Sequence, residues 1–357
     1  MEKLRMDLYL EQIAYISQLN IPWEKLSGKT ILLSGATGMV GTCLIDILMK
    51  WNDMQTAGNK VGVKVIALSR NEERAKENLG IYWERKDFQY VACDVNERIP
   101  EVGDVEFVIH AASNTHPLQY ANDSIGTITS NVLGTKNLLD YAVGHHTERF
   151  CFVSSVEVYG ENRGDVEKFD ESYLGYLDCN TLRAGYPESK RLGEALCNAY
   201  KQTYDLDFVI PRLSRVYGPT MLASDSKAIS QFIKKAAAGE DIVLKSEGNQ
   251  KYSYSYVTDV AAGILYTLLL AESGQALNIA DKESDITLKD LAGILAHLAD
   301  KEVIFELPEE SERRGYSTAT KAMLDASKLE QMGWQARVHM EEGLADTVDS
   351  VREKRGK

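Results

Sequence analysis

The sequence predicts an α/β fold in which a doubly wound parallel sheet is followed by a smaller, mostly helical C-terminal domain. Between residues 30 and 219, short runs rich in Val, Ile and Leu alternate with longer segments of helical periodicity. Continuous apolar runs are typical of strands in a parallel sheet that helices cover on both faces. The other two observations are a glycine-rich turn after the first run and the end of the alternation near residue 216.

The expected elements follow in order from the N-terminus. Residues 1–27 contain "LRMDLYLEQIAYISQL", whose scattered charges and apolar spacing predict an amphipathic helix. Residues 30–51 then predict a buried strand, a glycine turn and a helix. Further strands are expected within residues 60–70, 88–95, 105–113, 149–160 and 206–219, and helices at residues 71–79, 124–144 and 186–204.

Three regions are expected along the chain. Residues 1–27 form a helical extension, and residues 28–215 form the domain with the parallel sheet. Residues 216–350 form a C-terminal substrate-binding domain, from which the chain returns to the sheet near residues 250–270. The helical pattern of "SKAISQFIKKAAA", which ends at a glycine before a short apolar run, supports this division.

Composition excludes several classes of function. The net charge is −13 and the isoelectric point is about 5.1, so the surface repels nucleic acid and anionic membranes. The five cysteines form no C-x-x-C pair, and the six histidines form no H-E-x-x-H motif, so no metal site is expected. No signal peptide and no membrane span of roughly 20 apolar residues is visible, so we expect a cytoplasmic protein.

The glycine turn "GATGMVG" predicts a dinucleotide site of the Rossmann type. Gly35 permits the tight turn, Gly38 lets the backbone approach a pyrophosphate, and Gly41 lets the helix pack on the strand. The N-terminus of the following helix faces the anion. The turn also lies between a strand and a helix at the start of an alternating pattern, which makes it far more specific than a glycine triplet alone.

The end of the second strand bears on the choice of cofactor. An Asp or Glu there holds the ribose 2′-hydroxyl of NAD, but this sequence has Ser69 and Arg70, and no carboxylate before Glu72. An arginine there suits the 2′-phosphate of NADP. The alternative is an exposed arginine that opens the next helix. Asp94, after the third strand, is a candidate for contact with the adenine.

Several motifs occur in the order seen in a known family. They are the glycine turn, "HAAS" at residues 110–113, "SSVEVYG" at residues 154–160, Y-x-x-x-K at residues 186–190 and "RVYGP" at residues 215–219. Over residues 28 to 300 the chain resembles the extended short-chain dehydrogenase/reductases of the NAD-dependent epimerase/dehydratase branch. "SKRLGEALCNAYKQTY" and "YVTDV" look most like UDP-glucuronate decarboxylases and sugar-nucleotide dehydratases.

The resemblance implies catalytic roles for three residues. Tyr186 resembles the tyrosine that takes the proton of a sugar hydroxyl, and Lys190 resembles the lysine that lowers its pKa and holds the nicotinamide ribose. Ser155 resembles the residue that hydrogen bonds to that hydroxyl. The chemistry agrees, because a phenol with an ordinary pKa of about 10 needs a neighbouring cation to act as a base near neutral pH.

Glu157 bears on the step that follows sugar oxidation. It lies two residues after Ser155, so both side chains can point into one cleft. A carboxylate here resembles the base of the dehydratases and the matching glutamate of the decarboxylases, whereas simple 4-epimerases usually lack it. Val156 lies where the 4,6-dehydratases carry an acidic proton donor. The alternative for Glu157 is a solvated loop carboxylate.

Two positions depart from the family pattern. An arginine usually precedes the Y-V-x-D segment, but this sequence has Tyr252, and an asparagine usually lies in the turn before Y-G-P, where this sequence has Arg215. Arg215 is either a relocated clamp for an anion or a sign of a different substrate. Lys227, His116 and Tyr252 are further candidates for substrate contact. Lys227 and His116 also suit an exposed surface or loop, and Tyr252 also suits packing.

The resemblance implies a larger set of cofactor contacts. Besides Tyr186 and Lys190, it comprises Gly35, Thr37, Gly38, Met39, Val40, Gly41, Ser69, Arg70, Asp94, Val95, Ala111, Ala112, Ser113, Asn131, Ser154 and Arg212.

The sequence therefore predicts an NAD(P)-dependent enzyme that oxidises a nucleotide sugar transiently at C4 and then decarboxylates or dehydrates it. Ser69 and Arg70 favour NADP, and family habit favours NAD. A 4-epimerase, an NADPH-dependent carbonyl reductase and a non-catalytic dinucleotide sensor are the alternatives. The resemblance also implies a homodimer formed through the helices that begin near Ser124 and Tyr186.

Overall fold

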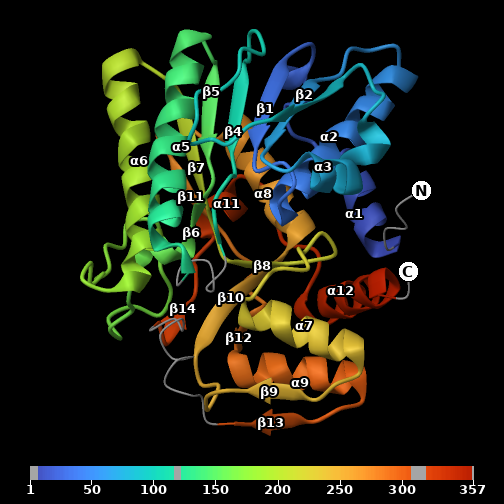
Figure 1. The fold of residues 1–357 in the computed structure, drawn as a ribbon, viewed down its shortest axis with the longest axis vertical. Coiled ribbons are helices and arrows are strands. Elements are labelled where there is room, and N and C mark those ends of the chain that lie inside the picture. The colour runs from blue at the N-terminus through green and yellow to red at the C-terminus, as the bar shows by residue number, and fades with distance from the viewer. Residues whose placement is uncertain (1–6, 116–121, 307–318, 356–357) are drawn as a thin grey trace.

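The computed structural model describes residues 7–115, 122–306 and 319–355, which fold into two lobes (Figure 1). The larger lobe is built on an 8-stranded sheet with the order β11-β7-β5-β4-β1-β2-β3, in which β6 also pairs with β7. All of its pairings are parallel, as the sequence predicted. Its strands are β1 (Thr30–Ser34), β2 (Lys64–Ser69), β3 (Phe88–Ala92), β4 (Phe107–His110), β5 (Arg149–Phe152), β6 (Ser154–Ser155), β7 (Phe208–Leu213) and β11 (Ala276–Ile279).

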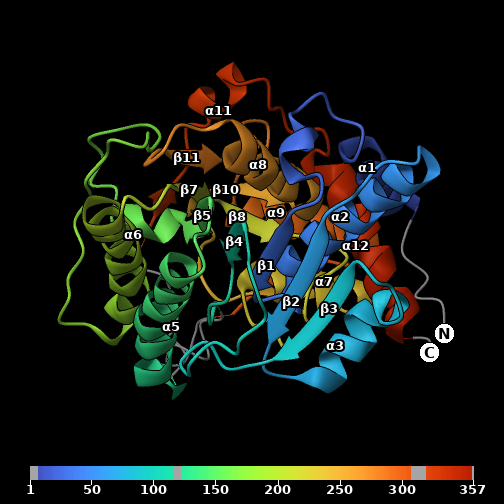
Figure 2. The same ribbon diagram turned by 90° about the horizontal axis from the view of Figure 1, so that it is seen from above.

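The two faces of this sheet bury two separate cores. Ile31 and Leu33 of β1 point into a core shared with the N-terminal helix and the helix after the glycine turn. Leu32 points to the opposite face, into the core beneath the two long helices seen side by side in Figure 2. This alternation explains why the strand is apolar throughout. The helices of this lobe are α1 (Asp7–Ile16), α2 (Met39–Ala57), α3 (Glu72–Leu79), α5 (Ser124–Gly144), α6 (Gly185–Tyr204) and α8 (Val257–Leu270).

The smaller lobe is formed by residues from the C-terminal half of the chain (Figure 1). Its strands are β8 (Arg215–Tyr217), β9 (Ile242–Leu244), β10 (Lys251–Tyr256), β12 (Asp285–Thr287), β13 (Val303–Phe305) and β14 (Lys321–Ala322). Its helices are α7 (Ala228–Ala238), α9 (Leu288–Ala299) and α12 (Met340–Arg355), whereas the short helix α11 (Ser327–Gln331) packs against β11 and α8 of the larger lobe. Short 3-10 turns lie at η1 (Trp23–Leu26), η2 (Gly80–Tyr82), η3 (Val156–Tyr159) and η4 (Leu182–Ala184).

Two features differ from the elements expected from sequence. The run 206–219 divides at Ser214 into β7 of the large sheet and β8, which pairs with β10 of the smaller lobe. The chain then returns to the large sheet through α8 and also through β11, whose four residues are too short a run to stand out in the sequence. The larger lobe thus takes its edge strand from the C-terminal half of the chain.

The N-terminal extension is packed against the larger lobe. Tyr9 of α1 is fully buried, and its hydroxyl donates to a carboxylate oxygen of Asp46 in α2 at 2.6 Å. Trp23 stacks on Trp51 with ring centres 5.3 Å apart. Within the described residues, no helix combines the length and the apolar character needed to cross a membrane.

Candidate active site

The glycine turn has the geometry that a dinucleotide cradle requires. Gly35 has a φ of +76°, and a Cβ atom there would lie 2.7 Å from the backbone of Ala111 and Ala112. A Cβ atom on Gly41 would lie 2.3 Å from the carbonyl oxygen of Gly35. Both positions therefore require glycine. Gly38 is the N-cap of α2, so the N-terminus of this helix faces the end of the sheet, as pyrophosphate binding requires.

A cavity of about 560 Å³ opens above this turn, at the carboxyl ends of β1, β2 and β4. This is where open α/β sheets bind nucleotides. Its chemistry fits a dinucleotide, because glycine backbone, small polar side chains and arginines line it. Of the residues predicted to contact the cofactor, Gly35, Thr37, Gly38, Ser69, Arg70, Asp94, Val95, Ala111, Ala112 and Ser113 line this cavity.

Two arginines lie at one end of the cavity. Arg70 and Arg74 both line it, and Arg70 forms an ion pair with Asp94 at 3.6 Å. The side chain of Asn71 accepts a hydrogen bond from the backbone N–H of Arg74 and so caps α3. Arg74 was missed by the sequence analysis, although its spacing of four residues from Arg70 was a signal that both share a face. Asn71, Cys93, Asn114, Ser130, Leu222 and Ser224 are further lining residues that were not predicted.

Tyr186 lies in the first turn of α6, where Pro187 and Glu188 favour the start of a helix. Its side chain is buried, and the side chains of Ser155 and Ser113 hydrogen bond to its hydroxyl. Burial raises the pKa of Tyr186 to about 12, and these hydrogen bonds lower it. Residues at the ends of two strands, β4 and β6, therefore converge on Tyr186, which the sequence predicted to be catalytic.

Lys190 lies one helical turn after Tyr186 and points to the same side. Its ammonium group is buried, donates to the carbonyl oxygen of Val153 at 2.9 Å and lies 4.8 Å from the centre of the Phe152 ring. Burial lowers the pKa of Lys190 to about 8. The structure therefore holds a buried cation one helical turn after the tyrosine.

Asn131 supports the site from α5. Ser113 donates to the side-chain oxygen of Asn131 at 2.7 Å, and the amide of Asn131 donates to Ser189 at 2.8 Å. Ser189 in turn donates to the backbone oxygen of Tyr186 at 2.8 Å. Asn131 is buried behind Ser113, so the structure places it in the support of the tyrosine and not in the lining of the cavity.

Glu157 lies beside Ser155 at the start of η3, so it is not a solvated loop residue. Only 20% of its side chain is exposed, and its two carboxylate oxygens lie 3.0 and 3.1 Å from one nitrogen of Arg183. Arg183 belongs to η4, directly before the helix that carries Tyr186. This ion pair was not predicted from the sequence, because the residues of the loop between η3 and η4 have no pattern that indicates its path.

Other predicted cofactor residues lie outside the cavity lining. Ser154 donates to Glu194 at 2.6 Å, and Arg212 forms a two-pronged ion pair with the same carboxylate at 3.0 and 2.6 Å. The guanidinium of Arg212 also donates to the Tyr159 hydroxyl at 3.0 Å. The side chains of Ser154 and Arg212 thus form hydrogen bonds and ion pairs with other residues of the protein. Met39, Val40 and Gly41 form the first turn of α2, beneath the cavity.

Arg215 and Tyr252 lie against each other between the lobes. The guanidinium carbon of Arg215 is 3.8 Å from the centre of the Tyr252 ring. The Tyr252 hydroxyl donates to the backbone oxygen of Ala319 at 2.7 Å. The two positions that depart from the family pattern are therefore neighbours in space, and the arginine lies beside the place where the family arginine is absent.

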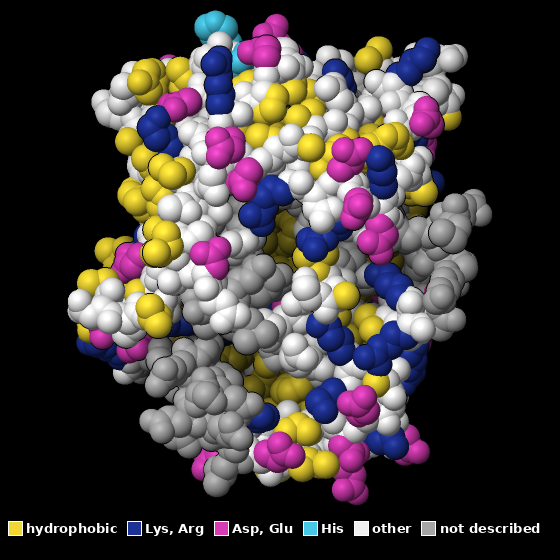
Figure 3. Space-filling view, in the orientation of Figure 1, with side chains coloured by type: hydrophobic (Ala, Val, Ile, Leu, Met, Phe, Trp, Pro, Cys, Tyr) yellow, Lys and Arg dark blue, Asp and Glu magenta, His cyan; other side chains and the backbone are white. Residues whose placement is uncertain are grey.

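Lys227 lies at the start of α7, on the smaller lobe. It pairs with the buried carboxylate of Asp225 at 2.9 Å and reaches Thr115 of the larger lobe at 3.4 Å. It therefore bridges the lobes near the cavity. His116 lies outside the described residues. Figure 3 shows a hollow between the lobes, with apolar side chains at its floor and Lys and Arg side chains around it.

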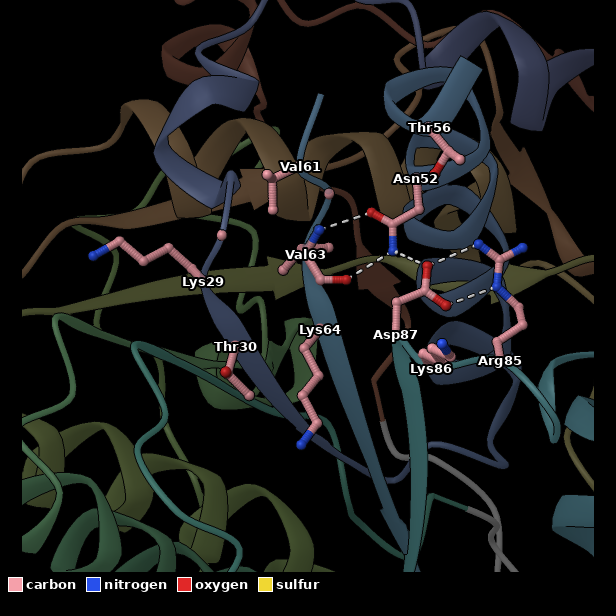
Figure 4. A pocket seen from close by; sticks show the side chains of 12 residues that line it. Lys29, Thr30, Asn52, Thr56, Val61, Val63, Lys64, Arg85, Lys86 and Asp87 are labelled. Atoms are coloured by element: carbon pink, nitrogen blue, oxygen red, sulfur yellow. Dashed lines mark hydrogen bonds and ion pairs between the residues drawn. The ribbon is translucent and has the colours of Figure 1, made fainter. Parts of the chain in front are cut away.

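A second hollow of about 650 Å³ lies at the opposite, amino-terminal edge of β1 and β2 (Figure 4). Lys29, Lys64, Arg85 and Lys86 line it. Its polar groups are used internally: Asn52 donates to Val63 at 2.7 Å and to Asp87 at 2.8 Å, and Arg85 pairs with Asp87. We therefore place the active site at the carboxyl edge of the sheet.

Comparison with known proteins agrees with this geometry. Residues 31–280 match the model of the NAD dependent epimerase/dehydratase family. The chain belongs to this family. It is therefore an NAD(P)-dependent enzyme of the epimerase/dehydratase type, and the predicted fold class and family are confirmed.

Relatives in sequence span almost the whole chain. UDP-glucuronic acid decarboxylase 5 from Arabidopsis thaliana is 29% identical over 335 residues, which cover 92% of this chain and 91% of the relative. UDP-glucuronic acid decarboxylase 1 from Danio rerio is 29% identical over 324 residues, which cover 90% of this chain and 72% of the relative. Both relatives carry the activity that the motifs of this chain resemble most.

Solved structures of the family have the same fold. The dTDP-glucose 4,6-dehydratase from Streptomyces venezuelae, solved with NAD and TYD bound, gives a TM-score of 0.78 at 25% identity and covers 92% of this chain and 98% of that chain. UDP-glucuronic acid 4-epimerase from Bacillus cereus, solved with UDP-glucuronic acid and NAD, gives a TM-score of 0.77 at 20% identity and covers 91% and 99%. The second likeness shows the fold alone.

Proposed function

We propose that this family member oxidises a nucleotide sugar transiently at C4 and then decarboxylates it or carries out a related elimination. The observation that carries the proposal is the convergence of Ser155, Glu157, Tyr186 and Lys190 beside the dinucleotide cavity. A dinucleotide sensor has no need for this set. The similarity to UDP-glucuronic acid decarboxylases supports the same reaction class.

The proposed first step is proton removal from the C4 hydroxyl. Tyr186, as the phenolate, takes this proton, and Ser155 orients the hydroxyl through a hydrogen bond. The Lys190 ammonium stabilises the phenolate, which its buried position otherwise disfavours. A bound nicotinamide supplies the hydride acceptor for this oxidation and the hydride donor for the closing reduction.

Glu157 is the residue that we propose acts after the ketone has formed. A ketone at C4 acidifies the neighbouring C–H and weakens the bond to a carboxylate at the β position. Glu157 lies beside Ser155 and is largely buried, so it reaches the same sugar as the tyrosine. Val156 has no proton to donate, which favours decarboxylation over 4,6-dehydration.

For the cofactor, we infer a preference for NADP. Arg70 and Arg74 line the same end of the cavity, and no carboxylate follows β2 before Glu72. Two guanidinium groups suit the 2′-phosphate, which is absent from NAD. The relatives solved with NAD bound speak for NAD as the alternative.

For the substrate, we propose that Arg215 and Lys227 hold its anionic groups. Both are cations at the edge between the lobes, on a chain whose net charge is −13. An anionic substrate needs such a local basic region. Tyr252 keeps the guanidinium of Arg215 in place by stacking on it.

The proposal is tested by mass spectrometry of the products from UDP-, dTDP-, CDP- and GDP-linked sugars, each offered as the neutral sugar and as the uronic acid. Loss of carbon dioxide from a uronic acid, without net consumption of NADPH, is the expected result. Steady oxidation of NADPH with a ketone substrate would instead establish a net carbonyl reductase, the second candidate that the two arginines favour. Inversion at C4 without loss of mass would establish a 4-epimerase.

We also propose a homodimer built from α5 and α6. These helices lie side by side on the outer face of the larger lobe (Figure 2), and apolar side chains at their surface remain exposed. Ile125 is 76% exposed and Leu182, directly before α6, is 70% exposed. A second copy that packs its own helix pair here would bury them. Light scattering coupled to size-exclusion chromatography measures the state directly.

A further inference from the structure

The pair formed by Glu157 and Arg183 joins the two segments that carry the catalytic residues. Glu157 follows Ser155, and Arg183 precedes Tyr186 by three residues. A single guanidinium nitrogen contacts both carboxylate oxygens, at 3.0 and 3.1 Å, and 17% of the Arg183 side chain is exposed. A carboxylate left without a partner at this depth would tend to rotate toward solvent. The pair therefore fixes the direction of the Glu157 carboxylate.

The same two side chains act on Tyr186 with opposite signs. The negative charge of Glu157 raises the pKa of Tyr186, and the positive charge of Arg183 lowers it. A carboxylate beside the tyrosine serves the step after oxidation but opposes the tyrosine ionisation that oxidation requires. An arginine paired with that carboxylate offsets its effect on the pKa of Tyr186.

The other charged groups near the tyrosine have partners of their own. Lys190 lies one helical turn after Tyr186 and faces the carboxylate of Glu194. Glu194 is itself paired with Arg212 at 2.6 Å. His110 stays neutral, because burial lowers its pKa to about 3.

We propose that Arg183 is a positioning residue that keeps the Glu157 carboxylate aimed at the sugar and offsets its negative charge beside Tyr186. This inference rests on the proposed function and assigns a part to a residue outside the Ser, Tyr and Lys set. It predicts that Arg183 affects both half-reactions, and that the opposite effects of Arg183 and Glu157 on the first largely cancel when both charges are removed.

The test measures the pH dependence of the first half-reaction, from the absorbance of reduced nicotinamide formed in single turnovers with the sugar that the product screen identifies. Arg183→Met should move the acidic limb of this profile upward by about one pH unit, because one close charge shifts a pKa by about one to three units. Glu157→Gln should move it downward. The double variant should fall between the two, near the wild-type protein.

A second measurement follows the tyrosine itself. The ultraviolet absorbance of phenolate, taken as the difference between each cofactor-loaded protein and the same protein with Tyr186→Phe, should give the same order of midpoints. Arg183→Lys keeps the positive charge, so the acidic limb of its pH profile should lie at the same pH as that of the wild-type protein. Arg163→Met is the matched control, because Arg163 is an exposed loop arginine that stacks on Tyr176, and it should leave the profile unchanged.

The outcomes separate the inference from the function on which it rests. If the wild-type protein reduces its cofactor with none of the nucleotide sugars, the proposed function fails. If it does so, but Arg183→Met lowers the rate equally at every pH and leaves the phenolate midpoint in place, Arg183 is merely structural and the inference alone is overturned.

Discussion

The guanidinium carbon of Arg215 lies 3.8 Å from the centre of the ring of Tyr252. The two residues meet because β8 and β10 pair in parallel with Arg215 opposite Tyr254, and Tyr252 lies two residues earlier on the same face. When a guanidinium stacks on an aromatic ring, its N–H groups lie in the guanidinium plane, and such groups can hydrogen bond to an oxyanion. The stack thus offers an anion contact next to the position where the family pattern expects an arginine.

Arg215→Ala should weaken binding of the nucleotide sugar by about 10- to 100-fold, since a hydrogen bond to a charged group contributes roughly 1.5–3 kcal/mol. Isothermal titration calorimetry measures the dissociation constant of the substrate. The Tyr186→Phe change is present in each protein compared, so that the substrate is not turned over. Arg163→Ala, which removes the arginine from another tyrosine stack, is the control. An unchanged affinity for Arg215→Ala would reject the clamp.

Tyr186→Phe should abolish turnover while the protein still binds its cofactor. The hydroxyl that this change removes is the proton acceptor that we propose, and the phenylalanine ring keeps the packing of a buried side chain. Turnover should fall by at least about 1000-fold, within the usual range for a general base. Cofactor content is read from the absorbance of the purified protein. Tyr204→Phe, at an exposed position at the end of α6, should behave as wild type.

The wild-type rate of sugar oxidation should rise as the pH rises through the neutral range. Burial raises the pKa of Tyr186 to about 12 in the protein alone, and the active form is the phenolate, which gains population at higher pH. The charge of bound oxidised nicotinamide lowers this pKa toward the working range. A rate that falls with pH over the same interval would contradict the assignment of Tyr186 as the base.

Arg70→Ala and Arg74→Ala should each reduce the preference for NADP over NAD by about 10-fold, because each removes one charge-assisted contact to the 2′-phosphate. Dissociation constants for both cofactors give the ratio. The exposed Arg98, after β3, supplies the control variant Arg98→Ala. Equal affinity of the wild-type protein for the two cofactors would refute the preference that the arginines suggest.

The sequence was sufficient for the larger lobe apart from its edge strand β11, because the signals for the other strands are local. β1 to β7 appear as apolar runs, and Gly35 and Gly41 lie at positions where the backbone leaves no room for a side chain. The catalytic roles of Ser155, Tyr186 and Lys190 were predicted from the resemblance to a family, because the spacing from Tyr186 to Lys190 occurs in any helix. Tyr186 and Lys190 lie one turn apart at the start of α6.

The contacts between distant segments could not be predicted. Arg183 reaches Glu157 across 26 residues, most of them in a loop without periodicity. Arg212 lies near the end of β7, yet its guanidinium pairs with Glu194, because a buried cation requires a carboxylate partner. The nearness of Arg215 and Tyr252 required the pairing of β8 with β10, and short strands leave little trace in a sequence.

Asp259 makes the stability of the protein depend on pH. Its carboxylate is buried at the start of α8 and accepts backbone hydrogen bonds from Arg337 and Val338 at 3.1 and 3.0 Å. Burial raises its pKa to about 7, while those hydrogen bonds lower it. The carboxyl of the unfolded chain has a pKa of about 3.9, so the folded state binds more protons between these two values.

The free energy of unfolding should therefore fall as the pH rises from about 4 to about 7, by an amount on the order of 2–4 kcal/mol from this residue. The raised pKa of His339, which hydrogen bonds to Asp281, acts in the same direction, since its stabilising charge is lost at higher pH. Urea unfolding at pH 5 and pH 8 measures the difference. Asp259→Asn keeps an acceptor for the two N–H groups but cannot ionise, so it should flatten most of the slope. Asp349→Asn, at the surface of α12, should leave the slope as it is. A slope that Asp259→Asn does not change would assign the pH dependence to other groups.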